Sequence, residues 1–324
     1  MAPVNFDGWL PIRVWKTAEQ WQVDWCWFGD TPLHQPFFRE AVEDALHLPF
    51  NQAFRRQTPL SALMDWQTLS PGLLPSAFIL HASRCGSTLI SQMLARLDDH
   101  IVVSEPPPLD ALLRSDLPDE ERRAAIVGLL SAYGQRRRGT EQRLVIKLDA
   151  WNIGEWPLLR ECFADTPWLF VYRDPLEIAV SHLRRPGLHM VPGALGDCVL
   201  DDDLPFEGRE DFIARRLGRL LEAGCVHCRE SAGLAVNYSE LPDAMSGRLA
   251  RFFGLSATQC EQALTATAQH AKQPSQPFVV DGEHKRREAS ALLRARIEDC
   301  ARAPYVALER LRALTISPTD PPYP

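Results

Sequence analysis

From Ser76 onward, short apolar runs alternate with segments of helical periodicity, and this alternation limits the possible fold more than any other feature. The runs occupy residues 77–82, 101–104, 144–148, 168–173 and 233–238. They are almost continuously apolar, as expected for parallel strands that helices cover on both faces. The pattern predicts an α/β fold, with a doubly wound parallel sheet of about five strands flanked by helices. Such sheets bind ligands at the carboxyl ends of their strands.

Residues 1–75 differ from the rest, because they hold six of the nine tryptophans and show little periodicity. Only residues 36–48 place apolar side chains on one face at helical spacing. We therefore expect an aromatic-rich N-terminal extension over 1–75, packed on the core, and a nucleotide-binding domain over 76–324. The alternative is that the aromatic side chains form a wall of an acceptor pocket.

Composition excludes several classes of partner. The formal charge of −7 argues against nucleic acid, although a local basic pocket could still hold one small anion. The N-terminus lacks a basic start followed by an apolar core, and no run approaches the ~20 apolar residues of a membrane helix. We therefore expect a cytoplasmic protein that contacts no membrane. The eight cysteines should be reduced thiols, and the close pair Cys225 and Cys228 lacks the second pair of a zinc site.

The first strand runs into the segment SRCGST, residues 83–88, and a helical pattern follows at once. Such a loop can wrap an anion with backbone N–H groups, and the helix N-terminus points its dipole at the same place. The predicted anion-binding residues are Ser83, Arg84, Cys85, Gly86, Ser87 and Thr88. A triphosphate-hydrolysing loop has Lys directly after this glycine, whereas here the cation precedes it.

A second strand–turn–helix junction follows residues 168–172. Arg173 ends the predicted strand, so its side chain should project at the carboxyl edge of the sheet. Asp174 can cap the next helix, Pro175 suits its first position, and Glu177 has the spacing of a capping box. Ser181 lies two helical turns farther on.

Together, the two motifs resemble those of sulfotransferases that use 3′-phosphoadenosine 5′-phosphosulfate (PAPS). In that family a (K/R)SGT(T/S) segment binds the 5′-phosphosulfate, and an Arg followed eight residues later by Ser binds the 3′-phosphate. RCGST at 84–88 is similar to the first, with Cys85 in place of Ser, and Arg173 and Ser181 match the second. The resemblance covers about 76–255 and includes the segment 235–255. It implies a P-loop-like fold and a reaction that requires no metal.

The resemblance also implies the chemistry, which is in-line transfer of a sulfuryl group from PAPS to a hydroxyl or amine of a small acceptor. The other product is adenosine 3′,5′-bisphosphate. Arg84 and the loop backbone would stabilise the charge that develops on the leaving group.

A base must accept the proton of the acceptor, and two carboxylates compete for this role. Cytosolic members of the family end one strand in Lys-Thr-His, where the His is the base. Lys147 matches that Lys, and Asp149 takes the place of the His. Carbohydrate sulfotransferases carry a Glu-Pro after the second strand, which Glu105 and Pro106 match. A helix cap or an ion pair is the structural alternative for each carboxylate.

Other residues are secondary candidates. His182 and His81 follow the carboxylates as possible bases, although His81 lies within a strand and should be buried. The family closes a C-terminal Arg-Lys-Gly loop over the 3′-phosphate. Lys285 and Arg286 in the KRR segment 285–287 could make that contact, or could form a solvated basic face.

Two further classes of protein remain open. One is a P-loop kinase or phosphotransferase that uses ATP or GTP, and the other is a non-catalytic nucleotide-binding protein of the same fold. The aperiodic segment 186–210 should be functional or poorly ordered. Its acidic run at 201–203 favours a small, neutral or cationic acceptor.

Overall fold

The structure is a computed structural model that describes residues 5–18, 20–196, 198, 200, 205–268 and 282–315. The chain forms two compact units. The first unit comprises Met1–Phe78, Ser91–Leu148 and Pro157–Pro167, and the second comprises Ile79–Ile90, Asp149–Trp156 and Trp168–Pro324.

The predicted five-stranded parallel sheet is present, with the strand order β5-β6-β4-β7-β8. Its strands are β4 (Pro75–His81), β5 (His100–Ser104), β6 (Arg143–Lys147), β7 (Trp168–Tyr172) and β8 (Leu234–Asn237). Each lies within a few residues of a predicted apolar run, so the α/β prediction is confirmed. β4 is the central strand, and the chain places later strands on either side of it. The loop after β4 therefore lies at a switch in strand order, where such sheets bind ligands.

Within the first unit, β5 and β6 pair in parallel from His100 opposite Arg143 to Ser104 opposite Lys147. Their carboxyl ends therefore lie side by side. The helices of this unit are α1 (Phe38–Leu46), α2 (Pro49–Ala53), α3 (Ala62–Leu69), α5 (Pro107–Leu113) and α6 (Asp119–Tyr133). The helix α1 confirms the helical period at 36–48.

The first unit also contains an antiparallel sheet of β1 (Trp9–Lys16), β2 (Trp21–Trp27) and β3 (Arg56–Pro59), which the sequence did not predict. Apolar and aromatic side chains occupy both faces of β1, and a register shift between Pro11 and Arg13 interrupts its alternation. Both features hide the two-residue period by which strands are recognised.

Aromatic side chains of the N-terminal segment pack on one another and on α6. The rings of Phe6 and Trp25 stack with their centroids 4.0 Å apart. Phe38 meets the buried Tyr133 ring edge-on at 5.2 Å, and the Tyr133 hydroxyl donates to the Pro11 carbonyl at 3.0 Å. Residues of the N-terminal segment are therefore integral to the first unit.

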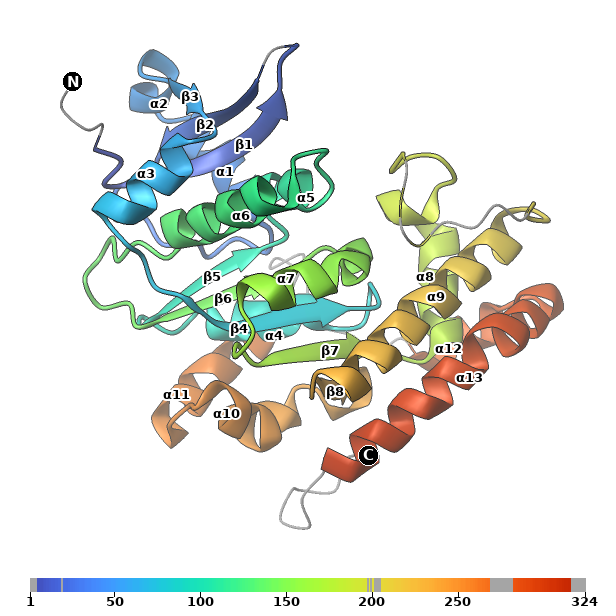
Figure 1. Cartoon of the computed structure of the whole chain (residues 1–324). Helices are drawn as coiled ribbons and strands as arrows, with labels where there is room; N and C mark the ends of the chain where they lie inside the picture. The colour runs from blue at the N-terminus through green and yellow to red at the C-terminus, as the bar shows by residue number, and fades with distance from the viewer. Residues whose placement is uncertain are drawn as a thin grey trace. The chain divides into compact units, whose positions relative to one another are not determined.

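In the second unit, β7 and β8 pair in parallel from Leu169 opposite Leu234 to Tyr172 opposite Asn237. The long helices α9 (Arg209–Glu230) and α13 (Ala291–Thr315) lie side by side (Figure 1), and α12 (Gly282–Glu288) packs on α8 (Pro175–Arg184). The remaining helices are α10 (Arg248–Phe253), α11 (Ala257–Leu264), η1 (Ala150–Glu155), η2 (Leu188–Met190), η3 (Tyr238–Glu240), η4 (Asp243–Ser246) and η5 (Thr265–Ala268). Two further helices, α4 (Ser87–Leu94) and α7 (Trp156–Cys162), have residues in both units.

The segment 186–210, which we expected to be functional or poorly ordered, contains the short helix η2. Residues 197, 199 and 201–204 lie outside the described residues, and they include the acidic run at 201–203. Across the described ranges, no helix combines the length and the apolar character that a membrane crossing demands.

Candidate functional site

The loop after β4 has the backbone of an anion cradle. Ser83, Arg84 and Gly86 have φ angles of 65°, 47° and 91°, and α4 begins directly afterwards at Ser87. Non-glycine residues rarely adopt positive φ, and turns that contain such residues direct successive N–H groups toward one concave side. The helix N-terminus adds further N–H donors and a partial positive charge.

Gly86 is required at its position for two reasons. Its φ of 91° favours glycine, and a Cβ atom there would lie 2.7 Å from Cδ2 of Tyr238 and 2.8 Å from Cδ1 of Leu241. The Tyr238 ring also lies over Arg173, whose guanidinium carbon is 4.2 Å from the ring centroid. Tyr238 therefore touches both predicted anion motifs. The sequence analysis did not select it as a site residue, and its position directly after a buried strand was the available signal.

The side chains of the loop point in different directions. Cys85 is fully buried, and its thiol donates to the Val171 carbonyl at 3.1 Å, so its side chain faces β7 and not the concave side of the loop. Arg84 donates through Nη2 to the Arg185 carbonyl at 2.5 Å and through Nε to Nδ1 of His182 at 3.4 Å. Burial, followed by the charge of Arg185, lowers the pKa of the Arg84 guanidinium. Ser87 and Thr88 are buried at the start of α4.

The second predicted motif begins with a capped helix. The Asp174 carboxylate accepts hydrogen bonds from the N–H groups of Leu176 and Glu177 at 2.9 and 3.2 Å, and Pro175 takes the first helical position. The predicted cap is therefore confirmed. The predicted capping box is wrong, because the Glu177 carboxylate is bound by arginines instead.

The Glu177 carboxylate lies between the two predicted 3′-phosphate cations. Its Oε2 accepts from Nε of the buried Arg173 at 2.5 Å, and its Oε1 accepts from Nε of Arg286 at 2.7 Å. The hydrogen bond to Glu177 raises the pKa of Arg286. Ser181 is four residues after Glu177 and therefore lies on the same face of α8. The structure thus brings Arg173, Ser181 and Arg286 to one face of one helix.

The helix α12 docks on α8 through further charged groups. Arg184 Nε donates to Glu288 at 2.9 Å, and this pairing lowers the pKa of Glu288. Lys285, the other predicted contact in this helix, is buried. The basic segment is therefore packed against the helix that holds Ser181, and only part of it is solvated.

The first unit contains the Glu105–Lys147 pair at the adjacent ends of β5 and β6. The Glu105 N–H donates to the Lys147 carbonyl at 2.7 Å, which extends the parallel ladder by one residue. Lys147 is completely buried, its ammonium group pairs with the Glu105 carboxylate, and it lies 5.2 Å from the centroid of the Phe37 ring. The Glu105 side chain stays 21% exposed, so the carboxylate can still meet a ligand.

Asp149, in the second unit, has a structural role. It is the N-cap of η1 and forms a capping box, in which its carboxylate accepts from the Asn152 N–H and the Asn152 side chain accepts from the Asp149 N–H. Its φ of −66° and ψ of 151° are ordinary extended values. The helix cap that the sequence offered as an alternative is therefore what the structure contains.

Backbone strain is present at Glu105 and absent at Asp149. Among the described residues, the non-glycine positions with positive φ are Ser83, Arg84, Glu105 and Ala232. Three of these four are predicted site residues. Positive φ at such residues costs about 1–3 kcal/mol and is concentrated at functional sites in proteins. The strain therefore favours functional roles for the loop after β4 and for Glu105.

Both histidine candidates are buried. His81 Nδ1 accepts from the Ser83 N–H at 3.0 Å, which helps to hold the loop after β4. His182 is fully buried, and its Nδ1 accepts from the Gly187 N–H at 3.1 Å as well as from Arg84. The His81 ring bonds the backbone of the loop and the His182 ring bonds the turn after α8, so neither has the exposure expected of an acceptor base.

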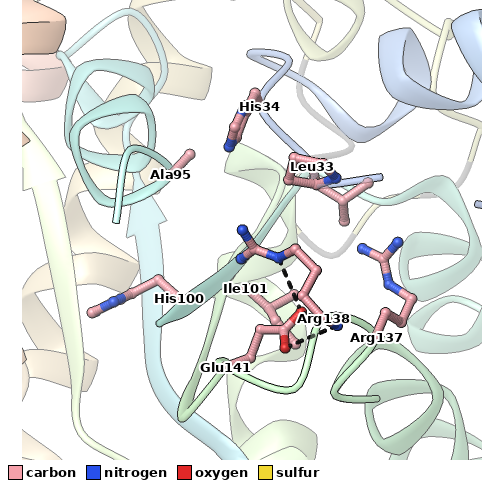
Figure 2. Close-up of a pocket in the computed structure, with 9 residues that line it drawn as sticks. Leu33, His34, Ala95, His100, Ile101, Arg137, Arg138 and Glu141 are labelled. Atoms are coloured by element: carbon pink, nitrogen blue, oxygen red, sulfur yellow. Dashed lines mark hydrogen bonds and ion pairs between the residues drawn. The ribbon is translucent and has the colours of Figure 1, made fainter. Parts of the chain in front are cut away.

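A small basic pocket in the first unit lies among residues that the sequence did not select (Figure 2). Its volume of about 10 Å³ is close to the minimum that holds one water molecule. Arg138 donates through Nε to Glu141 at 3.2 Å, and burial lowers the pKa of the nearby His34. No cluster of three or more metal-ligating side chains occurs in the part of the chain that the structure describes.

No protein-family model matches the chain, and no curated protein sequence matches it. The solved structures similar to it include three sulfotransferases. The sulfotransferase domain from the curacin biosynthetic pathway is 16% identical, with 75% of this chain and 98% of that one covered and a TM-score of 0.42. Sulfotransferase STF9 from Mycobacterium avium is 14% identical, with 80% and 82% covered and a TM-score of 0.46.

The third structure is a sulfotransferase from Alicyclobacillus acidocaldarius, which is 16% identical, with 74% and 96% covered and a TM-score of 0.45. All three proteins are sulfotransferases.

Proposed function

We propose that the chain is a sulfotransferase that moves a sulfuryl group from PAPS to a hydroxyl or amine of a small acceptor. The observation that supports this most is the contact of Tyr238 with Gly86 on one side and with Arg173 on the other. One ring thereby connects a phosphate-type loop to a separate, buried arginine. A nucleotide with anionic groups at both its 5′ and 3′ positions needs two such sites.

The residues of the second unit suit the two ends of PAPS. The loop after β4 offers backbone N–H groups, Arg84 and two hydroxyls to the 5′-phosphosulfate. Arg173, Ser181, Lys285 and Arg286 are the proposed ligands of the 3′-phosphate. Arginine suits this role because its planar fork binds phosphate oxygens in pairs.

In the proposed reaction, the acceptor oxygen or nitrogen attacks sulfur. The bond between sulfur and the bridging phosphate oxygen breaks, and its electron pair leaves with adenosine 3′,5′-bisphosphate. The Arg84 guanidinium and the loop N–H groups stabilise the charge that grows on that oxygen. The acceptor proton passes to a carboxylate.

We propose Glu105 as that carboxylate, with the buried Lys147 holding it in place. Glu105 is partly exposed and has a strained backbone, whereas the Asp149 carboxylate caps η1. The Lys147 ammonium also supplies a positive charge where the acceptor loses its proton. Asp149 would then affect the reaction only indirectly, because it fixes the start of η1.

Ligand-dependent thermal unfolding tests the proposal. PAPS and adenosine 3′,5′-bisphosphate should each raise the melting temperature, because a ligand at 100 times its Kd stabilises a protein by about 2.7 kcal/mol. ATP with Mg²⁺ should raise it less. Release of the bisphosphate from PAPS should then be measured against a panel of small alcohols, phenols and amines.

Each alternative class predicts a different result. A larger shift with ATP and Mg²⁺ than with PAPS would support the kinase interpretation. Tight binding of PAPS with no transfer to any acceptor in the panel would support the non-catalytic interpretation.

A further inference from the structure

The turn that follows α8 folds back onto Arg84. His182 lies in the last turn of α8, and its fully buried ring accepts two hydrogen bonds at Nδ1. One comes from the Gly187 N–H at 3.1 Å and the other from Arg84 Nε at 3.4 Å. Since a nitrogen that accepts carries no proton, this geometry requires a neutral imidazole with its proton on Nε2.

The His182 ring is held in place by its neighbours. It meets the buried ring of His189 edge-on, with the centroids 5.3 Å apart, and His189 in turn lies 5.5 Å from the ring of Trp151. A Cβ atom on Gly187 would lie 3.0 Å from Cε1 of His189 and 3.3 Å from Cε1 of His182. The glycine therefore allows both rings to pack closely over the turn.

Arg84 makes a second contact with the same end of α8. Its Nη2 donates to the carbonyl of Arg185, the C-cap residue, at 2.5 Å. A helix C-terminus attracts a positive charge. Nε and Nη2 lie on one edge of the planar guanidinium, so the end of α8 binds this edge. Among the described residues, this leaves the Nη1 end for a ligand.

We infer that His182 is a positioning residue, which holds Arg84 through Nδ1 so that the guanidinium meets the bridging oxygen on which charge grows during transfer. This inference rests on the proposed sulfotransferase function. A protonated imidazole could not accept the Arg84 hydrogen bond and would place a second positive charge beside the first. His182 is too deeply buried to accept a proton from an acceptor molecule.

Two substitutions separate the hydrogen bond from the volume of the ring. His182→Leu fills similar space without an acceptor, whereas His182→Asn can place its amide oxygen near the position of Nδ1. We expect His182→Leu to lower kcat about tenfold or more, because Arg84 loses a charge-assisted hydrogen bond that holds it in place. His182→Asn should recover most of the loss.

The affinity for PAPS, measured by calorimetry without an acceptor, should change less than about threefold in both variants, because the charge on the bridging oxygen grows only during transfer. His227→Leu on α9 controls for the loss of a histidine in the same unit. It should keep the kcat of the parent protein. Equal kcat values for His182→Leu and the parent, or no recovery in His182→Asn, would overturn the inference.

Hydrogen exchange at Arg84 Nε provides a readout that does not need activity. The ¹⁵N–¹H signal of this group, assigned by its loss in Arg84→Lys, should exchange slowly in the parent protein and quickly in His182→Leu. Unchanged exchange would show that His182 does not hold Arg84. Slow exchange in a protein that transfers no sulfuryl group would contradict the proposed function and leave the contact intact.

Discussion

Two arginines, Arg173 and Arg286, share the single carboxylate of Glu177. The three side chains together carry a net positive charge on the face of α8 that also holds Ser181. Glu177 fixes the two guanidinium groups through their Nε atoms, and the excess charge favours a dianion such as a phosphate. At the scale of single residues, the proposed 3′-phosphate site is thus a charged group built around an internal anion.

Arg173→Ala should weaken the binding of adenosine 3′,5′-bisphosphate about 10- to 100-fold, because a charge-assisted hydrogen bond is worth about 1.5–3 kcal/mol. Adenosine 5′-phosphate, which lacks the 3′-phosphate, should lose much less. Isothermal titration calorimetry with both ligands measures the difference. Arg229→Ala, at the exposed end of α9, should bind both ligands as the parent does. Equal losses for the two ligands would remove Arg173 from the 3′-phosphate site.

Glu105→Gln should lower turnover by about 10²–10⁴-fold, the usual contribution of a general base, and leave the nucleotide affinity nearly unchanged. It should also lower the melting temperature, because the buried Lys147 loses a charged partner. Asp149→Asn is the matched control, since Asn caps a helix about as well as Asp does. It should keep most of its stability and turnover. The reverse ranking of turnover in the two variants would make Asp149 the base.

At the scale of elements, α8 supports the proposed nucleotide site. Its N-terminus is capped by Asp174, its second turn carries Ser181, and its last turn binds Arg84 through His182. α12 adds Arg286 from outside. A change in how α8 begins should therefore affect both stability and nucleotide binding.

Asp174→Ala should lower the free energy of unfolding by about 1 kcal/mol, the typical value of a helix N-cap, and should also weaken adenosine 3′,5′-bisphosphate binding. Ser256→Ala removes a comparable cap at α11, where Ser256 accepts from the Gln259 N–H at 3.2 Å. It should lower stability by a similar amount without affecting the nucleotide. Urea unfolding and calorimetry on both variants provide the comparison. Unchanged nucleotide affinity in Asp174→Ala would show that the Asp174 cap does not support the proposed nucleotide site.

At the scale of the whole molecule, all eight cysteines are free thiols, and most of them are buried. Burial raises the pKa of Cys26 and of Cys162 from 9.0 to about 11, and it also raises the pKa of Cys225. Above pH 9 the unfolded chain releases these protons and the folded chain keeps them. The folded state therefore loses relative stability as the pH rises from about 9 toward 11.

The free energy of unfolding in urea should accordingly be level up to about pH 8.5 and fall between pH 9 and 10. Each such thiol contributes at most about 1.4 kcal/mol per pH unit. The window ends at pH 10 because tyrosines titrate in unfolded chains above it. The double variant Cys26→Ala and Cys162→Ala should show a shallower fall. An equal slope in the variant would show that these thiols do not cause it.

The sequence by itself determined the five-stranded sheet and the positions of its loops. Buried parallel strands are continuously apolar, and glycine, proline and capping residues mark where they end. Arg84 was therefore placed correctly in the loop after a strand, and Glu105, Asp149 and Arg173 at strand ends. The antiparallel sheet of the N-terminal segment escaped prediction. Its strands carry apolar side chains on both faces and contain a register shift, which removes the local period.

Only the tertiary structure decided which polar groups meet. The thiol of Cys85 faces β7, Glu177 binds two arginines instead of its own helix start, and Arg84 contacts His182, 98 residues away. From the sequence, Glu105 and Asp149 were equal candidates for the base. In the structure, Glu105 forms an ion pair with Lys147, whereas Asp149 caps η1. A local pattern reports backbone shape and burial, whereas the partner of a side chain is set by segments remote in the sequence that folding brings within a few ångströms.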